Sequence, residues 1–237
     1  MKVLKFDELT VYNSVYKYID SNMFIIVEQN EALIIDPHLN DDLQEILSQN
    51  KIRHITILFT HEHADHISGA WWLLKNYECN LICSEECAKK VSNSHAVKPL
   101  LLSFVIEEND RKKGTNVLSE FKKDFVVQTY SANLTYSKDF HYFWHSHNLY
   151  FRAIQGHSVG SCIIVLDKRY IFTGDSLLKE YPVIVSFPQG NKKAFLEQSI
   201  PFMEKNLSPD SIVFPGHGDP FFMSEIMKDG KINVELR

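Results

Sequence analysis

The sequence has no long hydrophobic run, no obvious targeting segment and little cysteine. None of its 237 residues belongs to a stretch of roughly 18 apolar residues, the length that a transmembrane helix requires. The first residues also lack the apolar core of a signal peptide. We therefore expect a cytoplasmic protein that does not bind membranes. Four cysteines are too few for a disulfide-rich miniprotein, and we expect them to be buried, reduced thiols.

An excess of positive charge is also missing. The chain has 25 Lys and Arg against 30 Asp and Glu, which gives a net charge of -5. This balance provides no cationic surface of the kind that binds duplex nucleic acid or anionic lipid. At 44% hydrophobic residues the chain can still bury a full core. We expect a small-molecule substrate and no nucleic acid partner, and nothing in the sequence indicates an oligomeric state.

No linker, repeat or low-complexity tract divides the chain, so we expect one domain over residues 1–237. Segments with strand-like patterns alternate with segments of helical periodicity, which indicates layered α/β packing. Residues 80–139 are the least legible, and the charged run EENDRKKG within them is predicted to be an exposed loop. The clearest strands are predicted at 15–19, 23–29, 31–37, 52–60, 140–144, 149–155, 161–167 and 169–175, and the clearest helices at 41–50, 69–77 and 194–206.

Histidine is concentrated in one short segment. The chain has 11 histidines, and His61, His63 and His66 share six positions with Glu62 and Asp65. This segment directly follows the apolar run IRHITILFT, which would hold the polar side chains at the end of a buried strand. Imidazole and carboxylate ligands without cysteine suit zinc, iron or manganese in an open, water-accessible site.

Three later segments repeat this arrangement of a strand that ends in a polar residue. His157 lies in QGHSVGS, Asp175 in FTGDS and His217 in PGHGD, each beside glycine. A single glycine-flanked polar residue is most often ordinary turn chemistry. Four such strand ends in one chain favour a shared site.

These motifs, taken in their order along the chain, resemble the metallo-β-lactamase superfamily, and TGDSLL and PGHGDP are most similar to its glyoxalase II-like branch. The resemblance implies a four-layer αβ/βα sandwich of two mixed β-sheets with helices outside and an active site along one edge. It implies that one metal ion binds His61, His63 and His157, that a second binds Asp65, His66 and His217, and that Asp175 bridges them. Asp36 takes the position of the superfamily's early structural aspartate.

The resemblance also implies an activity. Two divalent ions, most simply zinc with iron or manganese as alternatives, would carry a bridging hydroxide that cleaves a thioester, ester or lactone. Asp65 would orient this nucleophile as the catalytic carboxylate. Glu62 lies between ligands and is a rival for the role of base, against a supporting role behind the ligands.

Some features depart from glyoxalase II and bear on the substrate. The interval between His66 and His157 is long, which suggests an insertion over roughly 80–139, and few residues follow His217, so we do not expect the C-terminal helical domain that holds glutathione. Leu178 stands where quorum-quenching lactonases have tyrosine. We expect Tyr181 and Phe187 to contact substrate, and apolar walls to come from Phe104, Phe121, Phe125, Tyr130, Val183 and Pro188.

Three other functions remain open. A persulfide dioxygenase-like oxidoreductase would use a single iron on His61, His157 and Asp175. A binding or signalling module would keep the metal without efficient turnover, and a phosphodiesterase would fit the acidic chain less well. Outside the motifs, His141, His145 and His147 are predicted to face solvent in a hairpin, while His38, His54 and His95 are expected to be structural or surface groups.

Overall fold

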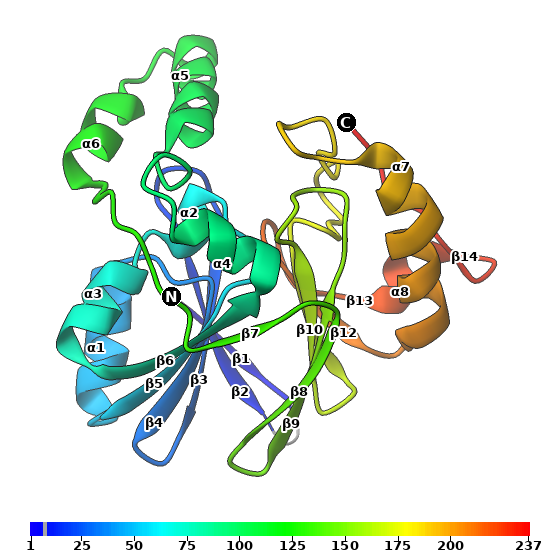
Figure 1. The fold of residues 1–237 in the computed structure, drawn as a ribbon, viewed down its shortest axis with the longest axis horizontal. Coiled ribbons are helices and arrows are strands. Elements are labelled where there is room, and N and C mark those ends of the chain that lie inside the picture. Colours follow the sequence, from blue (N-terminus) through cyan, green and yellow to red (C-terminus); the bar gives the residue numbers. More distant parts are fainter. Residues whose placement is uncertain (7–8) are drawn as a thin grey trace.

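The computed structural model describes residues 1–6 and 9–237. Within them, the first part of the chain forms a seven-stranded sheet in the order β1-β2-β3-β4-β5-β6-β7 (Figure 1). Neighbouring strands are antiparallel from β1 to β4 and parallel from β4 to β7. The strands are β1 (Lys2–Lys5), β2 (Thr10–Val15), β3 (Asn22–Glu28), β4 (Glu31–Ile35), β5 (His54–Leu58), β6 (Glu78–Ser84) and β7 (Leu134–Tyr136).

The second half of the described chain forms a six-stranded sheet in the order β13-β12-β11-β10-β9-β8. All its pairs are antiparallel except β11 with β12. Its strands are β8 (Asp139–Trp144), β9 (His147–Ala153), β10 (Cys162–Leu166), β11 (Tyr170–Gly174), β12 (Ile212–Pro215) and β13 (Phe221–Phe222), and β14 (Met227–Lys228) pairs with β15 (Lys231–Ile232).

Helices cover the outer faces of both sheets (Figure 1). Alternate strand residues point inward, so that Phe24 of β3 lies against Phe172 and Phe214 of the second sheet, with ring centroids 5.6 and 5.2 Å apart. The predicted four-layer sandwich is therefore confirmed. The helices are α1 (Asp41–Gln49), α2 (Ala64–Ile67), α3 (Ala70–Asn76), α4 (Glu85–Val91), α5 (Leu100–Lys113), α6 (Val117–Asp124), α7 (Lys192–Ala194) and α8 (Ile200–Asn206), with a π-helical turn at Phe195–Ser199 and a 3-10 turn at Met223–Ile226.

Residues 80–139 contain parts of the first sheet as well as helices. Strands β6 and β7 pair with each other, while α5 and α6 stand beside the sandwich (Figure 1). We call residues 92–129, which include α5 and α6, the helical arm. Its small core joins Leu102, Ile106 and Phe121 to Tyr16 and Tyr18 of the β2–β3 connection.

Three local predictions were wrong. Residues 16–19 form a turn closed by hydrogen bonds between Tyr16 and Ser21 and between Asp20 and Tyr16, because the tyrosine rings pack under the arm and not in a sheet. The residues EENDRKK form the last turns of α5, because charged side chains that face solvent are compatible with a helix. Gly114, at φ 68°, terminates this helix.

The third wrong prediction concerns the hairpin histidines. His141 and His145 are exposed residues, as predicted, although the His145 side chain alone is 18% exposed. His147 is half-buried, with a side chain that is 17% exposed. Their hairpin lies against the β3–β4 and β10–β11 turns, where His145 pairs with Glu31 and His147 with Asp167.

None of the described helices is both long and apolar enough to cross a membrane.

Candidate metal centre

The predicted ligands converge at one edge of the sandwich because each follows the end of a buried element. His61 and His63 lie between β5 and α2, and α2 carries Asp65 and His66. Asp175 directly follows β11 and His217 follows β12. These two strands are parallel and the Gly216 N–H donates to the Gly174 carbonyl, so Asp175 and His217 emerge side by side.

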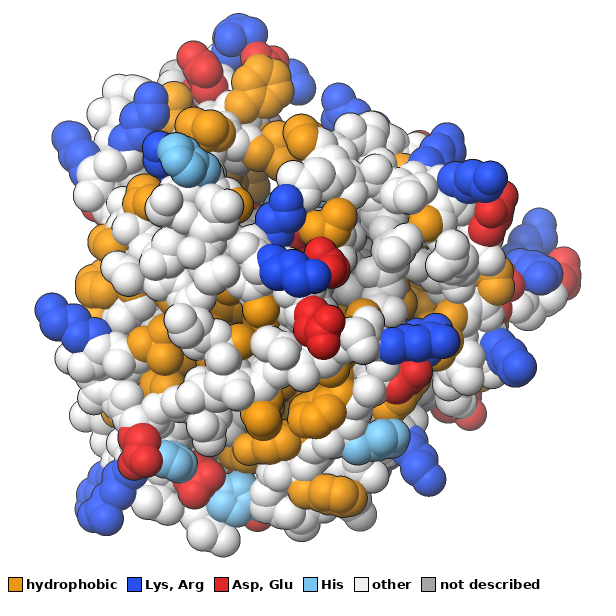
Figure 2. Space-filling model, viewed as in Figure 1, with side chains coloured by type: hydrophobic (Ala, Val, Ile, Leu, Met, Phe, Trp, Pro, Cys, Tyr) orange, Lys and Arg blue, Asp and Glu red, His pale blue; other side chains and the backbone are white. Residues whose placement is uncertain are grey.

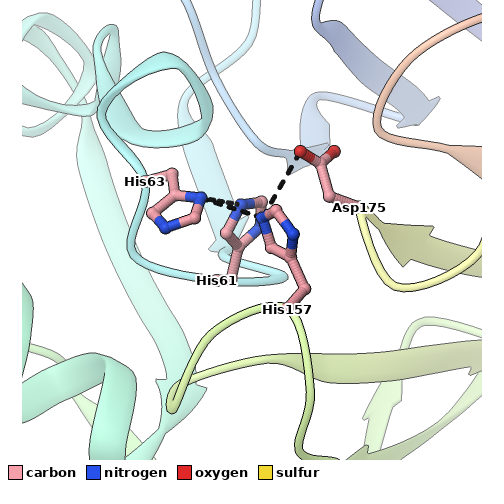
Figure 3. Close-up of side chains that lie close together, drawn as sticks. All are labelled: His61, His63, His157 and Asp175. Atoms are coloured by element: carbon pink, nitrogen blue, oxygen red, sulfur yellow. Dashed lines mark hydrogen bonds and ion pairs between the residues drawn. The ribbon is translucent and has the colours of Figure 1, made fainter. Parts of the chain in front are cut away.

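Three imidazoles form the first group of the site. His61 Nε2 lies 3.1 Å from His63 Nδ1, which in turn lies 2.9 Å from His157 Nε2. Figure 3 shows these nitrogens pointing toward one another, with the Asp175 carboxylate approaching from another direction. Asp175 Oδ2 is 3.5 Å from His157 Nε2. Three nitrogens and one oxygen thus face one point, as ligands of a single cation would.

The second group consists of Asp65, His66 and His217. Asp65 Oδ2 is 3.2 Å from His66 Nε2 and 3.6 Å from His217 Nε2. Asp175 links the two groups, because its Oδ1 lies 3.4 Å from His66 Nε2 while its Oδ2 lies 3.5 Å from His217 Nε2. The structure therefore brings all seven predicted side chains together, with Asp175 close to members of both groups. Their binding of metal remains a prediction.

The electrostatics of the two groups differ. In the first group, burial and then the charge of neighbouring histidines lower the pKa of His61 well below its usual value and that of His63 to about 3. Burial likewise lowers the pKa of His157. Neutral imidazoles have free lone pairs, which is the state that a metal ion binds.

In the second group, neighbouring charges shift the pKa values more than burial does. Burial opposes charge on His217, but Asp175 and Asp65 raise the pKa of this imidazole to about 10. Burial also opposes charge on Asp65, yet His66 and His217 hold the pKa of its carboxyl well below the usual value. The same carboxylates raise the pKa of His66 well above its usual value against the effect of burial, so the second group attracts positive charge.

Polar residues behind the ligands fix their orientation. Asp36, expected to support the site, accepts hydrogen bonds from the Thr60 N–H at 2.8 Å, the Thr60 hydroxyl at 2.6 Å and His66 Nδ1 at 2.9 Å. These bonds turn His66 Nε2 toward Asp65 and Asp175. Thr60 was not singled out from the sequence, because a threonine at a strand end has no distinctive signal.

His38 is a structural group, as expected, but it lies directly behind the site. It is fully buried, its ring stacks on Tyr16 at a centroid distance of 5.1 Å, and Asn40 lies 3.3 Å from its Nε2. Burial lowers its pKa to about 3. A neutral His38 therefore fills the space behind His66 without adding charge.

One glycine is required for the approach of Asp175. A Cβ atom on Gly216 would lie 2.0 Å from Asp175 Oδ1 and 2.8 Å from the Gly174 backbone. Any side chain at this position would displace the carboxylate that links the two groups. The glycine of the PGHGD motif thus has a steric role in addition to its turn.

The donor set fits a divalent metal. Two buried atoms that face the site, His66 Nε2 and Asp175 Oδ1, lie 3.4 Å apart as an ion pair, but neither forms a hydrogen bond with a described residue. Unsatisfied buried polar atoms are costly unless something else, such as a cation, engages them. Imidazole nitrogen and carboxylate oxygen are ligands for zinc, iron and manganese. His61, His63, His157 and Asp175 would hold one ion, and Asp65, His66 and His217 another. Asp175 lies close enough to His66 and His217 to contact this second ion as well.

The Glu62 carboxylate contacts the loop that carries His157 and not the two ligand groups. The Ser158 hydroxyl donates to Glu62 Oε2 at 3.0 Å, and burial raises the pKa of this carboxyl. This contact ties the loop that carries His157 to the segment that carries His61 and His63. The geometry favours the supporting role of Glu62 over the role of base.

A cavity of about 700 Å³ opens above the two groups. Tyr181 and Phe187 line it, and the Phe187 ring lies 6.0 Å from the rings of both His63 and His157. Pro188 also lines it, whereas Val183 is buried in the outer core.

The arm aromatics expected as walls are located elsewhere. Phe121 and Phe125 pack inside the arm, and Tyr130 packs on the first sheet and donates to the Ile67 carbonyl. Phe104 is 58% exposed and does not line the cavity. The arm wall is built from aliphatic residues of α5, listed here by position: Leu100, Leu101, Leu102 and Val105.

Two facing mixed sheets with a buried histidine and aspartate cluster at one edge define an αβ/βα sandwich with a candidate metal site. The chain matches the sequence profile of the metallo-beta-lactamase superfamily over residues 18–217, and it belongs to this superfamily.

Individual relatives are more distant. A hydroxyacylglutathione hydrolase from Francisella philomiragia is 37% identical over 59 residues, which is 25% of this chain and 23% of that protein. The match thus spans less than a quarter of this relative's length. The fold resembles the BLEG-1 B3 metallo-beta-lactamase, with a TM-score of 0.69, 18% identity and coverage of 91% of this chain and 95% of that one. It also resembles ETHE1 from Myxococcus xanthus, with a TM-score of 0.66, 18% identity and coverage of 91% and 80%.

Proposed function

We propose that the chain is a metal-dependent hydrolase that cleaves a thioester, ester or lactone of a small molecule. The observation that carries this proposal is the division of the ligands into two groups that share Asp175. A dinuclear zinc site, when loaded, supplies Lewis acidity and lowers the pKa of coordinated water toward neutrality. Hydrolysis adds this water across the acyl bond, giving a carboxylic acid and a thiol or alcohol.

The chain's own residues position and receive protons in this reaction. Asp65 lies between His66 and His217 at the floor of the cavity, where its carboxylate orients the attacking water and accepts its proton. His157 Nδ1 donates to the Ile184 carbonyl at 2.8 Å, which leaves Nε2 facing the site. The apolar cavity walls exclude bulk water from the reacting bond.

The second ligand group distinguishes this proposal from the dioxygenase alternative. A single-iron enzyme would need only His61, His157 and Asp175. The chain also buries Asp65 and His66, holds His66 through Asp36, and places His217 3.6 Å from Asp65, which favours a second ion. The partial similarity to hydroxyacylglutathione hydrolases, which are named for cleavage of an acylated glutathione, is consistent with an acyl substrate.

Metal analysis combined with a substrate panel tests the proposal. The zinc-loaded protein should hold about two ions per chain and hydrolyse at least one thioester, ester or lactone without oxygen. His66→Ala should abolish turnover, and His141→Ala, an exposed histidine on β8, should not. One iron per chain with oxygen consumption would establish the dioxygenase, and cleavage of phosphodiesters alone would establish a phosphodiesterase. A metal-loaded protein whose product formation is the same with His66→Ala would be a binding module.

A further inference from the structure

The cavity above the metal site has two apolar walls that face each other. One wall is the N-terminal half of α5, with Leu101, Leu102 and Val105. The other is the loop that follows β11, with Leu178, Ile184 and Phe187 among its lining residues. Figure 2 shows hydrophobic side chains gathered where the surface over α5 meets the surface over this loop. A slot between two apolar walls suits a hydrocarbon chain.

The polar lining of the same cavity is cationic. Lys90, Lys98, His95 and Lys113 line it, and Lys98, His95 and Lys113 are exposed at its rim. None of the three lysines forms an ion pair with a described carboxylate, whereas Lys17, Lys89, Lys179 and Lys231 all do. Outside the predicted metal ligands, the acidic lining residues are Asp20 and Glu62. In a chain of net charge -5, three unpaired lysines around one opening form a local anion-attracting surface.

Helix α5 connects the apolar and cationic parts. The lining residues Leu102, Val105, Asn109 and Lys113 recur every three or four positions, so one face of the helix borders the cavity along its length. Its first turns are apolar and lie near α2, since Leu102 and Ile106 share a core with Ala64. Its last turn is basic. A ligand lying along this face meets the apolar first turns of α5, with Lys98 just before the helix and Lys113 in its last turn.

We propose that the substrate is an acyl thioester with an apolar acyl chain of medium length and an anionic thiol carrier. The inference rests on the proposed hydrolase function and specifies its substrate class. Water adds to the thioester carbonyl carbon, the carbon–sulfur bond breaks, and the products are a fatty carboxylate, a proton and the free thiol. The slot between α5 and the loop after β11 holds the acyl chain, and Lys98 and Lys113 attract the anionic groups of the carrier.

The test uses acetyl, butanoyl and octanoyl thioesters of pantetheine, phosphopantetheine and glutathione with the zinc-loaded protein. We expect kcat/KM to rise about threefold for each added methylene until the slot is full. Phosphopantetheine thioesters should exceed neutral pantetheine thioesters by about tenfold at low salt, and this advantage should shrink at high ionic strength. A preference for glutathione over phosphopantetheine would assign the anion as carboxylate and not phosphate.

Matched variants on α5 locate the two effects. Lys98→Glu with Lys113→Glu should remove the roughly tenfold preference for phosphopantetheine over pantetheine thioesters. Lys112→Glu, exposed on the same helix but outside the cavity, should retain this preference. Leu101→Ser should flatten the dependence on chain length, and Phe104→Ser, which alters an exposed residue outside the cavity, should not.

The possible outcomes separate the two proposals. Equal kcat/KM for acetyl pantetheine and octanoyl phosphopantetheine would overturn the substrate class and leave the hydrolase in place. Binding of a non-hydrolysable octyl thioether of phosphopantetheine, measured by calorimetry, reports on the cavity without turnover. One outcome is that the thioether binds, with a lower affinity for the double lysine variant, while no thioester is hydrolysed. That result would support the assigned ligand class of the cavity and contradict the hydrolase function.

Discussion

The metal edge and the helical arm border the same cavity, but they are built differently. At the edge, His61, His66 and His157 are at most 2% exposed. Thr60 and Asp36, near the ends of β5 and β4, hold His61 and His66, and the main chain of the loop after β11 holds His157. The arm has a core of a few side chains and leaves Leu100 and Phe104 at 72% and 58% exposed. The rigid part carries the chemistry, and the part with fewer buried contacts, expected to open locally at lower free energy, carries the wall.

The largest effect is expected at the residue that joins the two ligand groups. Asp175→Ala should lower kcat/KM by at least about a thousandfold and reduce bound metal, because both groups lose a ligand. Asp139→Asn, an exposed carboxylate on β8, is the matched control and should change neither. Metal analysis and steady-state kinetics measure both, and near-normal turnover of the Asp175 variant with two bound ions would contradict the assigned bridge.

A pair of phenylalanine variants compares the sandwich with the arm directly. Phe214→Ala, between the sheets, should lower the free energy of unfolding of the whole protein by about 3–5 kcal/mol. Phe121→Ala is equally buried but lies in the arm, so it should increase hydrogen exchange in α5 and α6 while metal content stays at its normal value. Loss of metal in the Phe121 variant would show that arm and edge unfold as one unit.

Weakening the hydrogen bonds that Asp36 accepts behind the ligands should have an intermediate effect on metal affinity. Asp36→Asn retains the shape of the side chain but weakens the acceptor for His66 Nδ1 and Thr60, so we expect metal affinity to fall about 10- to 100-fold. Competition with a chelator measures this change. An unchanged affinity would mean that backbone packing alone orients His66.

The smallest effect is expected at Glu62. Its carboxylate accepts from Ser158, so Glu62→Gln should retain this contact and change kcat by less than about threefold. A pH–rate profile with the wild-type shape would accompany this result. A loss of several hundredfold in kcat would instead identify Glu62 as the base and remove that role from Asp65.

The edge was predictable from sequence and the arm wall was not, for a physical reason. Each predicted ligand lies in a segment that follows a buried strand, so a local pattern places it at an edge where neighbouring strand ends meet. Thr60 acts through contacts with Asp36, which lies 24 positions earlier in the chain, and no local pattern reveals such a partner.

The prediction of the residues that line the arm side of the cavity was wrong because α5 begins with an almost continuous apolar run, LLLSFVI. Hydrophobic periodicity therefore does not identify the buried face of this helix. Contacts with Tyr16 and Tyr18, far away in the chain, turn Leu102 and Ile106 inward. The sequence pattern instead suggested the aromatic side chains, since these bury the most area. Phe121 does so inside the arm, where the cavity cannot reach it.

The contact between His157 and the carbonyl of Ile184 has an evolutionary consequence. The imidazole is oriented by a main-chain atom of the very loop whose side chains shape the cavity. Every amino acid provides a main-chain carbonyl, so substitutions in this loop can change its side chains and still keep the hydrogen bond that orients His157. A change in what the cavity binds is thereby uncoupled from the orientation of His157.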